Sequence, residues 1–549
     1  MPTIKINKKV FEKLVGKKLP LEKLKDRISY LGTDLEDVNE NEIVVEIFPN
    51  RPDMLSEEGF ARAFSSFIGV KTGLKKYNVK KSGHKVIVDK SVSMRPYTTC
   101  AIVKNLNFND EMIREIMQIQ EKLALTHGRN RKKSAYGLYP LNNINFPIRY
   151  TAKDPNEVKF RPLGLEKEIS AVKVEELHPK GREFKWVAEG WKKYPFFIDG
   201  KENIMCMLPY TNSHHTGKVD ETTKEVFIEC TGTDLENVKQ ALNIIVTMLA
   251  DMGGQIYSLD IIYPSKTITT PNLNPEEMKV DIGYVNKILG LDLKENQIKT
   301  LLERMGFDYK NKKALIPAYR TDILHQIDLI EDIAIAYGYE NFIPSIPNLS
   351  TISAEDKFEI FKNKIADLLS GMGLIETCSY HLSNKEQQCS MMNTNLSLIE
   401  LENSISSDYN ILKAWNIPSL MEILSSNKHH EYPQKIFTIG TIFKKNPKSE
   451  TNIEEDERLA IAIASEKTDY TEIRQILDYL FRSINLKYEI TETEHDSFIT
   501  GRVGRVIVNG KNVAYIGEIS PQVITNWELE MPVTALELNL TELFNTISK

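Results

Sequence analysis

The spacing of apolar residues predicts an amphipathic helix near the start of the chain. Apolar side chains recur there at intervals of three and four residues, which place them on one helical face. Pro20 precedes this run and suits a position in the first turn. The apolar positions are Leu21, Leu24, Ile28 and Leu31.

The same pattern returns about half-way along the chain. Residues 6–34 align without gaps to residues 280–308, with glycines matched at both helix ends, and residues 49–69 align to 318–338. The second pair of segments shares an Arg-x-Asp sequence before a helix that ends at a glycine. Amphipathic helices can resemble each other by chance, but the matched glycines and the Arg-x-Asp sequence favour an internal duplication.

The duplication isolates a group of acidic residues in the second copy. Asp328, Glu331 and Asp332 stand where the first copy has Gly59, Arg62 and Ala63. On a helix these acidic residues share one face, and like charges so placed repel by roughly a few tenths of a kcal/mol per pair. A hard cation such as Mg²⁺, with Asp322 nearby, would offset that cost. Decoration of a helix N-terminus explains the pattern equally well.

Between the copies lies a region with an α/β pattern and two polar segments. In residues 127–133, HGRNRKK, four cations stand close together: Arg129, Arg131, Lys132 and Lys133. They suit a nucleic-acid phosphate backbone, although a solvated turn is the commoner explanation of such a run. Residues 208–234 are rich in hydroxyl, amide and histidine side chains, which suits either a polar ligand pocket or ordinary turns.

After residue 350 the pattern becomes that of a mixed α+β domain. A helix is expected over residues 355–373, followed by strands around residues 435–443, 459–465, 504–510 and 533–540. Along the sequence, this region shows no cluster of arginines or carboxylates suited to nucleotide chemistry.

Composition agrees with an α+β multidomain protein of ordinary globular type. The 549 residues suggest roughly three or four domains, for which we expect the boundaries 1–85, 90–265, 270–345 and 350–549. No stretch approaches the roughly 20 apolar residues that span a bilayer. Five scattered cysteines without CxxC spacing indicate reduced thiols. The net charge of −6 requires any nucleic-acid contact to come from local basic patches.

Taken in order, these segments resemble the β subunits of phenylalanyl-tRNA synthetases in their archaeal and eukaryotic-cytosolic form. The similarity lies in FPNRPDMLSEEGFARAF, HGRNRKK, TGKVDETTKEVFIECTGTD, IPAYRTDILHQIDLIEDIAIAYGYENF and SISSDYNILKAWNIPSLMEILSSN. The resemblance implies a cytoplasmic α₂β₂ heterotetramer that joins phenylalanine to its tRNA. The α subunit would bind ATP and phenylalanine and hold the synthetic site.

For the fold, the resemblance implies duplicated small helix-rich modules around a central α/β editing-like domain. The C-terminal domain would be a class II synthetase-like antiparallel-sheet domain without catalytic motifs. Residues 435–443 agree with the absence of catalytic motifs, since they lack the arginine and glutamate expected of an active class II enzyme.

The resemblance also implies that the central domain hydrolyses tyrosine mischarged onto the tRNA. A pocket shaped for an apolar side chain rejects an added hydroxyl by only about 10²-fold, so a second site is useful. The candidate editing residues are Asn212, Ser213, Thr231, Thr233 and Asp234, with Arg129 and Arg131 near the tRNA end.

For the acidic group, the resemblance implies a Mg²⁺ site shared with the α subunit, held by Asp322, Asp328, Glu331 and Asp332. An alternative for the whole chain is a free-standing tRNA-binding or trans-editing protein without a synthetase partner.

Overall fold

The two copies of the sequence repeat fold into the same order of elements. The first has β1 (Thr3–Asn7), α1 (Lys8–Val15), α2 (Leu21–Tyr30), β2 (Asp34–Val38), β3 (Glu42–Glu46) and α3 (Glu57–Phe67). The second has β16 (Glu276–Lys279), α9 (Ile282–Leu289), α10 (Glu295–Arg304), β17 (Asp308–Lys310), β18 (Lys313–Ile316) and α11 (Gln326–Tyr337). In each module the last strand lies at the centre of a three-stranded antiparallel sheet, in the orders β1-β3-β2 and β16-β18-β17. The predicted duplication is therefore confirmed.

Matched glycines end the first helix of each module. Gly16 has φ 83° and Gly290 has φ 66°, and the N–H of each donates to a carbonyl of the preceding turn. Only glycine adopts this left-handed conformation at little cost, which is why it follows both helices.

The two modules pack against each other in a roughly symmetric manner. A Cβ on Gly32 would lie 4.0 Å from Ile335, and one on Gly306 would lie 3.9 Å from Ser66. Ser66 and Ile335 are matched positions of the repeat. Ser66 Oγ also donates to the carbonyl of Glu303 at 3.1 Å. Each module thus presents the same surface to the other.

A ten-stranded mixed sheet forms between the modules along the chain. Its order is β12-β11-β10-β7-β4-β14-β5-β13-β6, with β15 added beside β14, and β4 runs parallel to β14 and β7. The strands are β4 (Val79–Val88), β5 (Tyr97–Lys104), β6 (Ser134–Pro140), β7 (Ile148–Lys153), β10 (Tyr194–Ile198), β11 (Ile204–Met207), β12 (Thr211–Asn212), β13 (Val226–Gly232), β14 (Gln255–Ile262) and β15 (Thr267–Thr270).

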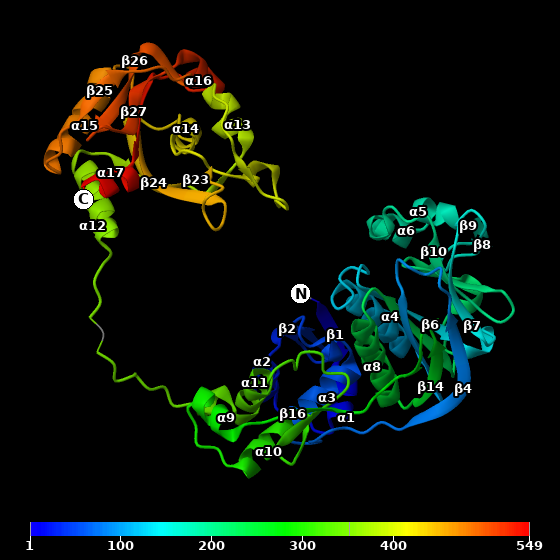
Figure 1. The fold of residues 1–549 in the computed structure, drawn as a ribbon. Coiled ribbons are helices and arrows are strands. Elements are labelled where there is room, and N and C mark those ends of the chain that lie inside the picture. Colours follow the sequence, from blue (N-terminus) through cyan, green and yellow to red (C-terminus); the bar gives the residue numbers. More distant parts are fainter. Residues whose placement is uncertain (1, 351, 548–549) are drawn as a thin grey trace. The chain divides into compact units, whose positions relative to one another are not determined.

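Two long helices, α4 (Asp110–Leu125) and α8 (Leu235–Asp251), cover one face of this sheet (Figure 1). Their buried side chains belong to a single hydrophobic core that also includes residues of both modules. The other face packs into a second core. A third core, which includes the short helices α5 (Val174–Leu177) and α6 (Pro179–Phe184), lies on the side of α4 and α8, because Phe196 and Ile198 of β10 belong to it whereas Phe197 belongs to the second core. The three domains expected in this part of the chain are therefore joined through their packing.

The structure, a computed structural model, describes residues 2–350 and 352–547. The chain divides into two units, Met1–Ile346 and Pro347–Lys549 (Figure 1). The division falls beside the boundary expected before the C-terminal domain.

The second unit is built on a seven-stranded sheet of order β19-β23-β24-β28-β27-β26-β25. All neighbours are antiparallel except β19 and β23. The strands are β19 (Ile375–Glu376), β23 (Gln434–Lys445), β24 (Ile453–Ala464), β25 (Glu489–Glu492), β26 (Phe498–Val508), β27 (Lys511–Ile519) and β28 (Val533–Asn539). The four predicted strands are present: β23, β24 and β26 are longer than predicted, and β28 ends one residue earlier.

Helices cover both faces of this second sheet. One core contains side chains of α12 (Lys357–Gly371), α15 (Tyr470–Ser483) and α17 (Leu540–Ile547), and the other contains side chains of α14 (Ile417–Ser426) and α16 (Pro521–Asn526). A smaller three-stranded sheet has the order β20-β22-β21, from β20 (Leu382–Ser383), β21 (Ile399–Glu400) and β22 (Ile411–Leu412).

All five cysteines are free, as their scatter predicted, and only Cys378 is exposed. Among the helices that the structure describes, none has the length and apolar character needed to cross a membrane.

Candidate functional site

The acidic residues predicted to hold a cation are divided between two environments. Asp322 accepts two hydrogen bonds from Arg320, at 2.8 and 2.7 Å, and Asp332 accepts one from the same guanidinium at 2.6 Å. Burial alone would raise the pKa of Asp322, but Arg320 outweighs it and lowers that pKa. For the fully buried Asp332, burial raises the pKa in spite of Arg320. Arg320 therefore supplies the positive charge for this pair.

Asp328 and Glu331 lie on the same helix within reach of solvent: Asp328 is half-buried in the first turn, and Glu331 is exposed near the middle. Asp328 Oδ2 accepts the backbone N–H groups of Leu324 and His325, each at 2.8 Å, and so caps α11. Glu331 Oε1 accepts the hydroxyl of Tyr339 at 2.6 Å. Both carboxylates remain within reach of solvent, unlike Asp332. Of the predicted set, these two have the accessibility and the oxygen chemistry that a partly hydrated Mg²⁺ requires.

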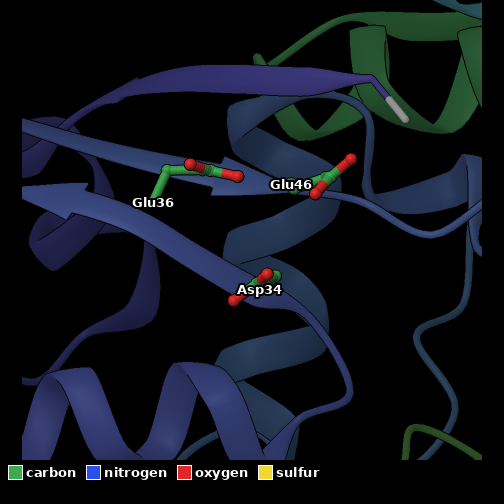
Figure 2. Close-up of side chains that lie close together, drawn as sticks. All are labelled: Asp34, Glu36 and Glu46. Carbon is green, nitrogen blue, oxygen red and sulfur yellow. The ribbon is translucent and has the colours of Figure 1, made fainter. Parts of the chain in front are cut away.

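A different acidic group lies in the first module. Asp34, Glu36 and Glu46 place carboxylate oxygens within 4.8 Å of one another (Figure 2). Asp34 is opposite Glu46 in the β2–β3 pair, and a bulge between Leu35 and Asp37 brings Glu36 alongside them. Exposed carboxylates often gather without an ion, so the group by itself does not establish a metal site.

The basic segment forms a turn with unusual backbone geometry. Three successive residues, Arg129, Asn130 and Arg131, have φ of 48°, 53° and 64°. Left-handed conformations at consecutive non-glycine residues are costly and are concentrated at functional sites. Arg129 is exposed, as is Lys132, which leaves both side chains accessible to a phosphate.

Arg131, in contrast, is committed to contacts within the protein. It donates to the carbonyls of Pro209 and Tyr210 at 3.1 and 3.0 Å, and to Glu121 at 3.0 Å. Its guanidinium also lies 4.6 Å from the ring centroid of Phe184. These bonds tie the basic turn to the polar segment that begins at residue 208.

The end of β13 adjoins the same turn. Thr231 is fully buried, whereas Thr233 is exposed and its N–H donates to the carbonyl of Lys133 at 3.0 Å. Asp234 caps α8 through the N–H groups of residues 236 and 237. Lys133 lies 3.3 Å from Asp234. Bonding to the Asn237 N–H and to Lys133 lowers the pKa of Asp234, which is therefore ionised at neutral pH.

Asn212 belongs to a separate polar group inside the central domain. The hydroxyl of Tyr139 lies 3.0 Å from Asn212 Oδ1 and 3.3 Å from Glu229 Oε1. Burial raises the pKa of Glu229 to about 8, so its carboxyl is largely protonated at neutral pH. Glu229 Oε2 is buried and has no hydrogen-bond partner within the described chain. A Cβ on Gly137 would lie 2.6 Å from Glu229 Oε1, so glycine leaves room for this group.

The sequence interpretation missed Tyr139 and Glu229, because both stand within strands whose side chains were expected to pack into the core. A glutamate within the buried strand EVFIECTG was the available signal. Arg95 was missed as well: it is fully buried and donates to the carbonyls of Arg131 and Thr231 at 2.9 Å each. Arg95 thus links the basic turn to β13, and brings the two predicted polar segments together.

A hollow of about 520 Å³ opens beside Asn212. Apolar side chains of α4 form one wall, and the polar lining includes Arg161, His214 and Lys218. This combination of an apolar wall and a few polar groups suits a small organic ligand. Ser213 is buried next to it, and its N–H donates to the carbonyl of Met205 at 2.7 Å. Thr231, Thr233 and Asp234 are not among the residues that line the hollow.

Family models match two parts of the chain. Residues 278–339 match the tRNA synthetase B5 domain, and residues 343–540 match the phenylalanyl tRNA synthetase beta chain CLM domain.

Full-length relatives are also found. The chain is 42% identical over 555 residues to the phenylalanine–tRNA ligase beta subunit of Pyrococcus abyssi, covering 99% of this chain and 100% of that protein. It is 37% identical to the phenylalanine–tRNA ligase beta subunit of Archaeoglobus fulgidus, and the match covers 100% of this chain and 99% of that protein. Among solved structures, an N-terminal fragment of the phenylalanyl-tRNA synthetase beta subunit from Pyrococcus horikoshii is 39% identical, with a TM-score of 0.59, over 62% of this chain and all of the fragment.

Proposed function

Because this chain belongs to the family of archaeal phenylalanine–tRNA ligase beta subunits, and so is a subunit of an aminoacyl-tRNA synthetase, we propose that it acts with an alpha subunit to join phenylalanine to its tRNA using ATP. The observation that carries this proposal is the extent of the similarity, which covers 99% of the chain and the whole of the Pyrococcus abyssi subunit. The alpha subunit would bind ATP and phenylalanine, and the assembly would be a cytoplasmic α₂β₂ heterotetramer. The second unit would be a class II synthetase-like domain without chemistry of its own.

Co-expression with the alpha subunit tests the partnership. The two chains are expected to co-purify, and aminoacylation of phenylalanine tRNA should require both. If the purified chain ignores the alpha subunit and adds nothing to aminoacylation, it is a free-standing tRNA-binding or trans-editing protein instead.

We further propose that the first unit hydrolyses tyrosine mischarged onto the tRNA. The hollow beside Asn212 supports this, since its apolar wall would accept an aromatic ring while Asn212 and its neighbours would bond a hydroxyl. Ser213 borders that pocket. Thr233 and Asp234 lie beside the basic turn, where they would help to position the tRNA end, and the buried Thr231 would support them from within the sheet. A positioned water and fixed dipoles suffice for hydrolysis, so a protein nucleophile is not required.

Deacylation of tyrosyl-tRNA without ATP tests the editing proposal. Asn212→Ala and Tyr139→Phe, which removes the hydroxyl bonded to Asn212, are each expected to slow hydrolysis by about tenfold or more. Phenylalanine attachment should remain unchanged. Thr222→Ala, in an exposed turn, is the matched control. Normal deacylation in both pocket variants would remove the site assignment.

Two binding roles complete the proposal. Arg129, Lys132 and Lys133 would contact the tRNA backbone, and Arg131 would hold their turn in place. Mg²⁺ would bind on the solvent side of α11 through Asp328 and Glu331, where its charge would offset the repulsion between them. Asp322 and Asp332 would stand behind this site, neutralised by Arg320.

A further inference from the structure

A polar hollow of about 710 Å³ lies on one face of the seven-stranded sheet in the second unit. Along β24 and β28 this face is divided into two parts. Ala460, Ala462 and Ala535 are buried beneath α14 and α16, whereas Asp456 and Arg458 line the hollow. Because side chains alternate along a strand, these residues of β24 belong to one face.

Cross-strand pairing gathers charged residues that are far apart in the sequence. Arg505 on β26 is opposite Tyr515 on β27, and Tyr515 is opposite Glu537 on β28. Glu537 in turn lies 3.0 Å from Arg458 of β24. Residues opposite each other in a sheet point to the same side. The second unit therefore contains the group of arginines and carboxylates that its sequence pattern failed to reveal.

The carboxylates of this group are already neutralised. Glu537 accepts hydrogen bonds from Arg458 and from the N–H groups of Asn416 and Ile417, each at 3.0 Å. Asp456 Oδ2 accepts hydrogen bonds from Lys444 at 2.7 Å and from Asn539 at 3.0 Å. Neither carboxylate is free to attract a cation into the hollow.

The guanidinium groups are less completely matched. Arg505 has no carboxylate within 4.0 Å among the described residues, and it stacks at 3.9 Å over the ring of Tyr515. Arg458 pairs with Glu537 on one side only, and its Nε is buried without a partner in the described chain. Burial lowers the pKa of Arg505, Tyr515 opposes that effect and Arg458 adds to it. Both arginines line the same hollow, where like charges repel each other. An anion between them would relieve this repulsion.

Aromatic rings form another wall of the hollow. The ring of His495 lies 5.6 Å from Trp415, 5.2 Å from Phe498 and 4.9 Å from Tyr515, and all four residues line the space. Rings at these separations offer faces and edges on which another planar group can stack.

We propose that this hollow binds a small organic anion that carries a planar ring, of about the size of a nucleoside monophosphate. Its phosphate or carboxylate group lies against Arg505 and Arg458, and its ring lies against the wall formed by His495 and Tyr515. The volume falls within the roughly 300–1,000 Å³ typical of small-molecule sites. The proposal does not depend on the alpha subunit or on editing.

Isothermal titration calorimetry on the full-length chain, purified without a partner, tests the proposal. AMP carries both the ring and the anion, adenosine carries only the ring, and inorganic phosphate carries only the anion. AMP is expected to bind at least about tenfold more tightly than either part. Phenylpyruvate, an aromatic carboxylate, is titrated beside it. AMP and phenylpyruvate each carry a ring and an anionic group, so the one that binds more tightly shows whether the site prefers phosphate or carboxylate. Tight binding of either supports the proposal.

Variants locate the binding. Arg505→Gln is expected to weaken AMP binding by about tenfold or more, because a charge-assisted hydrogen bond is lost. Tyr515→Leu keeps that charge and removes the ring, and it should reduce AMP affinity to the level of phosphate. Arg502→Ala is the matched control, since Arg502 stands on the same strand, pairs with Glu518 and does not line the hollow. Absence of AMP and phenylpyruvate binding, or equal AMP affinity in the wild type and both cavity variants, would overturn the proposal.

Discussion

The guanidinium of Arg320 lies 2.6 Å from a carboxylate oxygen of Asp332, in a pair that the first module cannot form because Ala63 stands at the matching position. The rest of the arrangement is duplicated. Arg51 holds Asp53 through bonds of 2.8 and 2.9 Å, as Arg320 holds Asp322. All four of these residues have largely buried side chains. The repeat therefore preserves a buried ion pair in each copy, and the second copy adds one more carboxylate.

Arg320 is expected to be the residue of this group on which stability depends most. Arg320→Met leaves Asp322 and Asp332 without the guanidinium that is bonded to them, with only the charge of Arg51 nearby. The loss of one partner of a buried ion pair typically costs about 3–5 kcal/mol. Asp332→Ala, which copies the first module, leaves the Arg320–Asp322 pair in place and should cost less. Thermal unfolding measures both.

The double variant Arg320→Met/Asp332→Ala separates charge from packing. It should be more stable than Arg320→Met, because one of the two stranded carboxylates is gone. Arg114→Met, at an exposed ion pair, serves as the control and should change stability by less than about 1 kcal/mol. Equal destabilisation by Arg320→Met and Arg114→Met would contradict the assignment.

Mg²⁺ binding should depend on the exposed carboxylates of α11. Asp328→Asn combined with Glu331→Gln removes two negative charges, while the amide oxygen introduced at position 328 can still cap the helix. We expect this double variant to lose the Mg²⁺ dependence of its assembly with the alpha subunit, measured as complex stability with and without chelator.

The acidic group of the first module provides the comparison. Asp34→Asn with Glu36→Gln also removes two exposed charges, and it should leave the Mg²⁺ dependence intact. If the α11 variant depends on Mg²⁺ for assembly as strongly as the wild type does, or if the wild type assembles equally well in chelator, these carboxylates merely decorate a helix.

The contact between α3 and α4 should weaken as the pH rises. Burial, with Glu115 nearby, raises the pKa of Glu57 to about 8, and the pKa values of Glu58 and Glu115 are raised for the same reason. The unfolded chain releases these protons near pH 4.5, the ordinary glutamate value. Protonation therefore stabilises the fold most at low pH, and this contribution is lost as the pH rises through about 8.

Melting temperature measured from pH 6 to pH 9 tests this expectation. Glu115→Gln should flatten the decline, because its amide cannot ionise. Asp110→Asn, at an exposed position of the same helix, should leave the decline unchanged. A wild-type melting temperature that rises over this range would refute the assignment.

The two arginines of the basic turn should respond differently to substitution. Arg129→Ala is expected to weaken tRNA binding and to reduce the salt dependence by about one phosphate contact. Arg131→Ala should chiefly lower thermal stability, because Arg131 bonds two carbonyls and Glu121.

Filter binding at several salt concentrations, with thermal melting in parallel, separates these two effects. Lys448→Ala, an exposed cation in the second unit, is the control for a general change of charge. An Arg129→Ala variant with unaltered tRNA affinity would show that the turn is simply solvated.

Local pattern was sufficient for the duplication and for the elements that were predicted within it. Helical periodicity, matched glycines and the Arg-x-Asp sequence are properties of neighbouring residues, so they can be recognised along one chain. The two modules consequently have the order of elements that their alignment predicted. The same reasoning found one helix and four strands of the second unit, α12, β23, β24, β26 and β28, apart from their exact ends.

What each charged group faces was decided by tertiary structure alone. Helical spacing placed Asp328 and Asp332 near each other, but packing buried Asp332 against Arg320 and left Asp328 at the surface. Arg458 and Arg505 are brought to one hollow by strand register, which no local pattern encodes. Periodicity determines which side of an element a residue occupies, whereas the partner of that side depends on contacts between distant segments.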